Sequence, residues 1–224
     1  MTDIATAWNQ YSGQRPERRP TNARGETTWF NWTQYPDHGP GVEVLGLQPG
    51  SRVLDLGCGK GGNIAHLATL GMTAVGVDVS PVQLRAARGR WGAVPGLSLE
   101  RADAVTYLSQ NAKGFDAAYS VYGAAWFTNP DDLIPLVFKA LRPGGVLAFS
   151  QRPPVEGCYD CQASYIPRGD DEDPLVVRRW DYPEDEWRRR LLDYGFTTVQ
   201  ARTVEAPAGR RRTGTLMVRA ERAG

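Results

Sequence analysis

Residues 51–62 read SRVLDLGCGKGG, and this stretch decides the fold of the chain. An apolar run, Val53–Leu56, leads directly into a turn that contains four glycines, and a helix-like segment, Asn63–Ala68, follows without a break. Glycine adopts backbone conformations closed to other residues and lets a ligand approach peptide N–H groups. The order of strand, glycine turn and helix therefore predicts a ligand at the turn.

The glycine turn alone fits two kinds of nucleotide site. Gly57, Gly59 and Gly61 form the GxGxG pattern typical of S-adenosylmethionine (SAM) sites. Gly57, Gly59 and Gly62 equally form the GxGxxG pattern of dinucleotide folds. Both interpretations stay open at this point, and residues further along the chain are needed to separate them.

Composition narrows the classes of function. The formal net charge of the 224 residues is +1, which gives no reason to expect a nucleic acid or an anionic membrane as partner. No apolar run is long enough to span a membrane, and the N-terminus lacks the apolar core of a signal peptide. Three cysteines form no disulfide framework, so we expect a cytoplasmic protein. Cys158 and Cys161 are half of a zinc motif without its second half, so no metal is expected.

Apolar strands alternate with helical segments from residue 51 onward. The expected strands are 52–56, 73–77, 97–101, 115–120 and 145–150. The expected helices are about 61–70, 80–90, 103–109 and 130–141. This alternation predicts an α/β fold with a doubly wound, mostly parallel sheet and helices on both faces. After a last helix at 184–193, the runs 196–205 and 213–220 are expected to pair in antiparallel fashion at the edge of the sheet.

The ends of this region suggest a division into two parts. Residues 1–41 are expected to form an N-terminal lid over the substrate pocket, because the polar stretch 12–28 joins two segments rich in aromatic residues. Residues 42–224 form the catalytic domain, in which 152–180 breaks the strand and helix rhythm and is expected to be an inserted loop.

Two aspartates follow the second and third expected strands. A carboxylate at Asp78, beside the glycine turn, can accept hydrogen bonds from both ribose hydroxyls of an adenosine, in NAD and SAM folds alike. Asp103 separates the two cofactors, since a carboxylate there can accept from the adenine amino group and dinucleotide folds have no systematic equivalent. Both residues also fit the simpler role of a helix N-cap.

The motifs DLGCGKGG, GVDVS, RADA, FDAAYSVYG and LRPGGVLAFS, in this order, resemble those of class I SAM-dependent methyltransferases. The resemblance covers residues 42–205 and is nearest to small-molecule enzymes, such as those acting on quinones and on bacterial specialised metabolites. It implies a seven-stranded sheet whose last strand is antiparallel, which agrees with the terminal pair of strands.

The resemblance also implies a set of cofactor-binding residues. They are Asp55, Gly57, Cys58, Gly59, Gly61, Asp78, Val79, Asp103, Ala104 and Ser120. Asp55 and the glycine backbone would hold the methionine moiety, and Asp78 the ribose. Val79 would pack on the adenine, whose edge Asp103 and Ala104 would read. The region of Ser120 would lie under the sulfonium. Cys58 fits a packed small residue better than a nucleophile.

Aromatic residues are the candidates for acceptor binding. They are Tyr11, Trp29, Trp32, Tyr35 and Trp126. An apolar pocket with polar tips is expected where they meet, although each of them also fits a plain packing role. His38 is the candidate imidazole base, and Tyr122 is the candidate residue to orient a nucleophile.

The sequence therefore predicts methyl transfer from SAM to an oxygen or nitrogen of a small, aromatic or amphipathic metabolite. An NAD-dependent oxidoreductase is the first alternative, permitted by the glycine turn and by Asp78. The second is a SAM-binding protein that acts on a macromolecule or has no catalytic activity. The identity of the acceptor and the oligomeric state cannot be derived from these residues.

Overall fold

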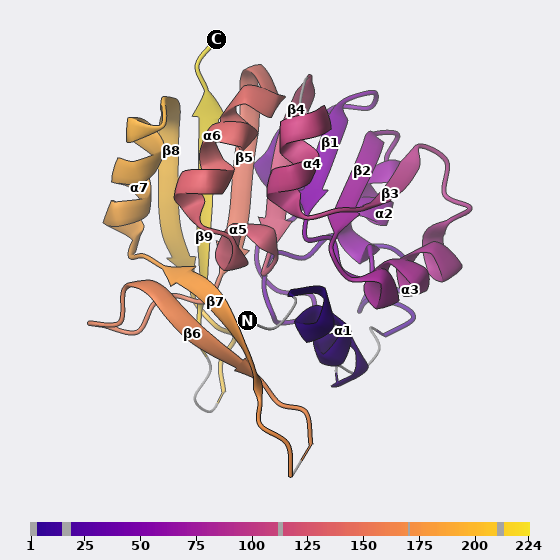
Figure 1. The fold of residues 1–224 in the computed structure, drawn as a ribbon. Coiled ribbons are helices and arrows are strands. Elements are labelled where there is room, and N and C mark those ends of the chain that lie inside the picture. The colour runs from indigo at the N-terminus through magenta and orange to yellow at the C-terminus, as the bar shows by residue number, and fades with distance from the viewer. Residues whose placement is uncertain (1–3, 15–18, 112–113, 170, 210–212) are drawn as a thin grey trace.

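A computed structural model describes residues 4–14, 19–111, 114–169, 171–209 and 213–224 (Figure 1). At its centre is a seven-stranded sheet in the order β3-β2-β1-β4-β5-β9-β8. Its strands are β1 (Arg52–Leu56), β2 (Thr73–Asp78), β3 (Leu97–Arg101), β4 (Phe115–Val121), β5 (Leu141–Gln151), β8 (Phe196–Val204) and β9 (Thr215–Arg222). The first five strands of this order, β3, β2, β1, β4 and β5, pair in parallel. Strand β9 is antiparallel to both of its neighbours, β5 and β8. The predicted sheet, with its antiparallel last strand, is confirmed.

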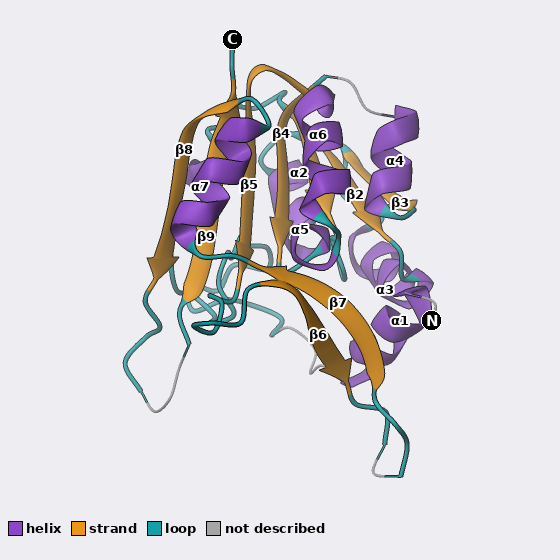
Figure 2. Cartoon of the chain, turned by 60° about the vertical axis from the view of Figure 1, so that its left-hand side comes forward, coloured by secondary structure: helices purple, strands orange, loops and turns teal. Residues whose placement is uncertain are grey.

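Helices cover both faces of the sheet, as Figure 2 shows. One face carries α4 (Ala104–Asn111), α6 (Pro130–Ala140) and α7 (Glu184–Asp193), and the other carries α2 (Gly62–Thr69) and α3 (Pro81–Trp91). Successive side chains of a strand point to opposite faces. In β1, Leu54 and Leu56 therefore pack with the first group of helices, while Val53 packs with α2. Near-continuous apolar runs follow from burial on both sides.

Helices α3 and α6 begin at residues whose side chains satisfy a free backbone N–H group. The hydroxyl of Ser80 accepts a hydrogen bond from the N–H of Gln83, and Pro81 opens α3. Asn129 caps α6 in the same way, with Pro130 in the first turn. Proline has no N–H to leave unpaired at this position. These caps fix where each helix leaves the carboxyl end of the preceding strand.

The segment predicted as an inserted loop contains a hairpin instead. Strands β6 (Asp160–Ile166) and β7 (Leu175–Asp181) pair in antiparallel fashion and form a second, two-stranded sheet at the lower end of the molecule (Figures 1 and 2). Leu175 and Val177 are buried on one face of β7, while Val176 between them is exposed. The expectation of a loop was wrong because this period-two pattern is short and lies between proline-rich and acidic stretches.

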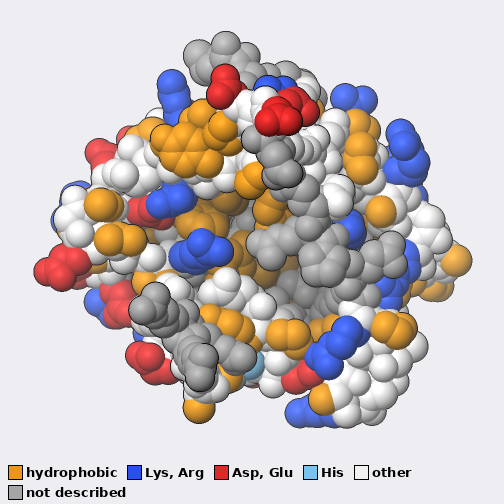
Figure 3. All heavy atoms as spheres, turned by 90° about the horizontal axis from the view of Figure 1, so that it is seen from below, with side chains coloured by type: hydrophobic (Ala, Val, Ile, Leu, Met, Phe, Trp, Pro, Cys, Tyr) orange, Lys and Arg blue, Asp and Glu red, His pale blue; other side chains and the backbone are white. Residues whose placement is uncertain are grey.

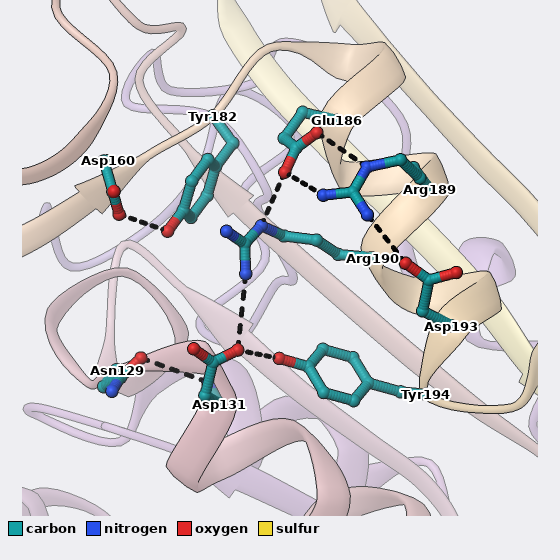
Figure 4. Close-up of polar contacts among 9 residues, drawn as sticks. All are labelled: Asn129, Asp131, Asp160, Tyr182, Glu186, Arg189, Arg190, Asp193 and Tyr194. Carbon is teal, nitrogen blue, oxygen red and sulfur yellow. Dashed lines mark hydrogen bonds and ion pairs between the residues drawn. The ribbon is translucent and has the colours of Figure 1, made fainter.

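A polar network connects the base of the hairpin to the main domain (Figure 4). The Tyr182 hydroxyl donates to Asp160 at 2.6 Å, and the Arg190 guanidinium lies over the Tyr182 ring. Arg190 also bonds to Glu186 within α7 and to Asp131 at the start of α6. Each exposed ion pair contributes little alone. Together they hold the hairpin strands at a fixed position relative to α6 and α7.

The N-terminal segment divides into two structurally different parts. Helix α1 (Ile4–Gln14) packs on the hairpin, where Ala7 joins a small buried cluster with Ile166 and Leu175. Trp32, in contrast, is fully buried in the main core beside Phe30. A short 3-10 helix, η1 (Val42–Leu45), continues into β1. Within the expected lid, α1 and Gln34 line cavities, whereas Trp32 belongs to the core.

Over the part of the chain that the structure describes, no helix combines the length and the apolarity needed to cross a bilayer. Within the same ranges, no group of three or more His, Cys, Asp or Glu side chains is placed to hold a metal ion.

Candidate active site

A cavity of about 260 Å³ opens at the carboxyl ends of β1, β2 and β4. Figure 3 views the molecule from this end and shows a hollow with apolar walls and basic side chains beside it. The residues that line the cavity come from the glycine turn, the ends of the strands and α1. They include Ile4, Trp8, Tyr11, Gly57, Cys58, Gly59, Asp78, Val79, Asp103, Ala104, Val121, Tyr122 and Phe127. Ligands of open α/β sheets bind at this edge.

The glycine turn requires glycine for two different reasons. Gly57 has φ of 84°, and a Cβ there would lie 2.6 Å from the backbone nitrogen of Ala124. Gly59 has φ of 55°, but a Cβ there would meet nothing nearer than the Gln83 side chain at 3.4 Å. Gly57 thus permits close packing of the turn against the residues after β4. Gly59 keeps the cavity open to a ligand.

Asp78 ends β2 and supports the turn from below. Its carboxylate accepts hydrogen bonds from the N–H groups of Gly59 and Ser80, both at 2.8 Å. The side chain is buried, and burial raises the pKa of Asp78 above its usual range, opposed by these backbone donors. Each carboxylate oxygen has a second acceptor site, because an oxygen carries two lone pairs. Asp78 can therefore support the turn and still accept from ribose hydroxyls.

Asp103 lies at the opposite wall of the same cavity. One of its oxygens accepts from the N–H groups of Val105 and Thr106, at 3.0 and 3.1 Å, and so caps α4. The helix-cap interpretation is therefore correct for this oxygen. Asp103 and Ala104 both line the cavity, so the second oxygen and the backbone remain placed to meet an adenine edge.

A smaller cavity of about 190 Å³ lies on the other side of the glycine turn and shares Gly57, Cys58 and Val121 with the first. Asp55 and Gly61 line it. Burial raises the pKa of Asp55 to about 8, opposed by the Tyr119 hydroxyl and reinforced by the charge of Asp78. Burial likewise raises the pKa of the Cys58 thiol, which makes it a poor nucleophile.

The Ser120 side chain holds two strand ends together and does not face a cavity. Its hydroxyl donates to the carbonyl of Leu56 at 2.7 Å and accepts from the N–H of Ala125 at 3.1 Å. It is fully buried and lines none of these cavities. Ser120 instead fixes the end of β4 against the end of β1, and the next residue, Val121, lines the cavity.

A third cavity, of about 630 Å³, adjoins the first and extends toward the β6–β7 hairpin. The two share four aromatic residues: Trp8, Tyr11, Tyr122 and Phe127. Trp126 lines the larger one and packs edge-on against Tyr122. Of the residues predicted to bind an acceptor, Tyr11 and Trp126 are thus brought together here.

Tyr122 stands where the two larger cavities meet. It has φ of 49°, in the left-handed region that a bulky residue rarely occupies. Its hydroxyl lies 2.8 Å from the Thr215 hydroxyl, and burial raises its pKa above the usual range. Tyr122 is therefore a hydrogen-bond donor at neutral pH and not a base. Its strained backbone aims the ring into the shared wall.

Besides Ser120, four residues predicted to bind the acceptor or act as a base lie outside all three cavities. Trp29 and Trp32 are buried, and the Trp32 indole donates to the carbonyl of Gly41 at 2.8 Å. The Tyr35 hydroxyl donates to the carbonyl of Thr213, and Nε2 of His38 lies 2.7 Å from the carbonyl of Glu205. These partners belong to the end of β8 and the start of β9. The aromatic cluster was expected at the pocket, but Phe30 and Trp32 pack into the apolar core on the α2 side of the sheet.

Several residues that line the third cavity were not predicted from the sequence. They are Trp8, Arg152, Tyr165 and Arg179. Nothing in the sequence around Trp8 indicates what its side chain covers. Arg179 lies in the hairpin that was expected to be a loop. The spacing of two residues between Leu175, Val177 and Arg179 was the available signal, because alternate residues of a strand share one face.

The sequence of this chain is similar to sequences of known methyltransferases. Residues 53–145 match the family model described as "Methyltransferase domain". Trans-aconitate 2-methyltransferase of Paracidovorax citrulli is 36% identical over 114 residues, which cover 49% of this chain and 43% of that protein. The chain thus spans less than half the length of the trans-aconitate relatives that it matches.

Solved structures share the fold. A SAM-dependent methyltransferase of Mesorhizobium loti superposes with a TM-score of 0.60 at 24% identity, over 80% of this chain and 94% of that one. The 1,6-didemethyltoxoflavin-N1-methyltransferase of Burkholderia thailandensis, solved with its substrate and S-adenosylhomocysteine, gives 0.56 at 21% identity, over 79% and 72%. Residues 53–145 thus resemble a methyltransferase domain, and the chain has the fold of solved SAM-dependent methyltransferases.

Proposed function

We propose that this protein transfers the methyl group of SAM to an oxygen or nitrogen of a small, aromatic or amphipathic acceptor. One observation carries the proposal: the cavity at the glycine turn opens into a larger, aromatic-lined cavity through a shared wall that includes Trp8 and Tyr122. A nucleoside cofactor and a separate acceptor can thus meet at that wall. The sequence resemblance to enzymes of bacterial specialised metabolism supports an acceptor of that kind.

The residues present fit SAM. Asp78 offers acceptors to ribose hydroxyls, and the absence of a side chain at Gly59 leaves room beside the turn. Asp55, in the small cavity across the turn, can bond to the amino group of a methionine moiety. When bound, SAM supplies an electrophilic methyl group on its sulfonium.

The chain's own contribution is then mainly positioning. Orienting two reactants within a cavity removes most of the entropic barrier to an in-line displacement. Tyr122 can donate a hydrogen bond to the acceptor, and α1 excludes water from the junction through Trp8 and Tyr11. His38 lies elsewhere, so we propose no imidazole base. This replaces the role first assigned to His38.

Binding and turnover experiments test the proposal against its alternatives. We expect calorimetry to detect S-adenosylhomocysteine (SAH) and SAM but not NAD, and labelled SAM to methylate small aromatic acceptors. Binding of NAD in preference to SAH would contradict the proposal in favour of an oxidoreductase. Binding of SAM with methylation of protein or RNA, and of no small acceptor, would favour the macromolecular alternative. We place the reaction in the cytoplasm, a compartment that suits the unpaired cysteines.

A further inference from the structure

The acceptor cavity has a charge of one sign. Among the described residues that line it, the charged side chains are Arg152 and Arg179. The other lining residues are aromatic, aliphatic or neutral polar, such as Gln34 and Ser164. Arg179 is partly buried and Arg152 is exposed to solvent, so the cavity offers an anionic ligand two guanidinium groups with no acidic side chain on its lining.

Arg179 is held in place by a buried carboxylate. Its Nε donates to Asp181 at 2.7 Å, and the other Asp181 oxygen accepts from the Trp126 indole at 2.7 Å. Asp181 is 3% exposed, and its two oxygens thus fix the cavity-lining side chains Arg179 and Trp126 together. Because Nε is used, the two terminal nitrogens of Arg179 remain for a ligand. They present a fork that matches a carboxylate.

Arg152 comes to the same cavity from the loop that directly follows β5. The Gln151 side chain donates to the carbonyl of Trp180 at 3.2 Å, so the chain at 151–152 runs beside the chain at 179–180. Arg152 makes no hydrogen bond or ion pair with any described residue. Its charge nevertheless acts in the cavity, since it is one of the charges that affect Tyr122.

We propose that Arg152 and Arg179 bind a carboxylate of the acceptor, so that the substrate is a small aromatic carboxylic acid. With Asp181 ionised, the three side chains carry a net charge of +1, which a monoanion neutralises and a phosphate dianion exceeds. The aromatic walls, Trp126 among them, accommodate the planar remainder of the molecule. This inference rests on the proposed function, because it assigns the larger cavity to the acceptor.

Three probes of similar shape test the inference: benzoate, benzamide and phenyl phosphate. Their binding to the SAH-bound protein is measured by calorimetry and by quenching of tryptophan fluorescence. SAH is used because its sulfide is neutral, whereas the sulfonium of SAM would itself attract an anion. We expect benzoate to bind at least tenfold more tightly than benzamide and more tightly than phenyl phosphate.

Variants then locate the interaction. R152Q and R179Q should each weaken benzoate binding about tenfold and leave benzamide binding unchanged. R152Q disturbs no internal partner, so its result stands even if R179Q folds poorly after losing Asp181. R178Q is the matched control, because Arg178 is the neighbouring residue on the exposed face of β7.

Each outcome decides the question. Equal affinity for benzoate and benzamide, no binding of benzoate, or unchanged benzoate binding by R152Q would overturn the carboxylate assignment. Tighter binding of phenyl phosphate would replace it with a phosphate site. The SAH affinity of the same samples separates the two proposals: a protein that binds no SAH contradicts the methyltransferase, while one that binds SAH and ignores the carboxylate contradicts only this inference.

Discussion

The carboxylate of Asp78 accepts a hydrogen bond from the backbone N–H of Gly59 at 2.8 Å, so the residue that ends β2 supports the turn that follows β1. Residues 19 positions apart are thereby combined into one surface at the carboxyl edge of the sheet. A nucleoside bound there would contact both residues. A substitution at Asp78 therefore alters the support of the glycine turn as well as the contact with the ligand.

Replacing Asp78 by Asn should weaken SAH binding about ten- to hundredfold, measured by calorimetry. The two backbone donors use different oxygens of Asp78, so the amide keeps only one of these hydrogen bonds and lacks both the charge and the second acceptor oxygen that ribose hydroxyls require. Asp173→Asn is the control, because Asp173 is exposed and far along the hairpin loop. Parent-like SAH affinity of the Asp78 variant would contradict the assignment of this residue to the ribose.

Alanine substitutions should separate the two roles of glycine in the turn. Gly57→Ala should lower the free energy of unfolding by about 3 kcal/mol or more, because its Cβ meets backbone at 2.6 Å. Gly59→Ala should cost about 1–2 kcal/mol of stability but abolish SAH binding. Gly50→Ala gives the cost of a left-handed backbone alone, since a Cβ there meets nothing within 4 Å. A Gly59 variant that binds SAH normally would make the turn purely structural.

The sequence allowed prediction of features that local chemistry determines. Gly57, Asp78 and Asp103 each lie at or just after the end of a strand, and the carboxyl ends of parallel strands necessarily share one edge. The seven-stranded sheet was predictable for the same reason, as its strands are apolar runs separated by well-capped helices.

Features that depend on tertiary packing were not predictable. Trp8 and Trp32 look alike in the sequence, yet one lines both larger cavities and the other is fully buried. Which of them faces a ligand depends on what the segment packs against. Arg179 could not be assigned either, because its role requires β7, and Asp181 behind it, to be placed against Trp126.

Stability should fall as the pH rises from about 4 to about 8, because burial raises the pKa of Asp55 from its unfolded value near 3.9 to about 8. The folded protein holds a proton in this range that the unfolded chain has lost, so the slope is negative, at up to about 1.4 kcal/mol per pH unit. Asp55→Asn cannot lose that proton and should flatten this part of the profile in denaturant titrations. An identical slope in the variant would show that Asp55 is ionised in the folded state.

Helix α1 should become protected from hydrogen exchange when SAH binds. Ile4, Trp8 and Tyr11 line the cofactor cavity, and a ligand there adds apolar surface for them to pack on. The amides around Trp32 should be protected already without SAH, as that side chain is part of the core. Trp8→Ala should abolish the SAH-dependent protection and lower turnover while the fold persists. Equal exchange of α1 with and without SAH would exclude closure by this helix.

Tyr122 and His38 should respond differently to substitution, although both were candidates for catalysis. Tyr122→Phe removes the hydroxyl at the wall between the cavities and should lower kcat/KM about tenfold, with unchanged affinity for SAH. Because burial keeps this hydroxyl protonated, the loss should be the same from pH 6 to pH 9. His38→Gln should leave turnover at the parental rate across that range, because the imidazole contacts the carbonyl of Glu205 and lines neither cavity. A fall in rate for His38→Gln that grows with pH would instead restore the imidazole as the base that accepts the acceptor's proton.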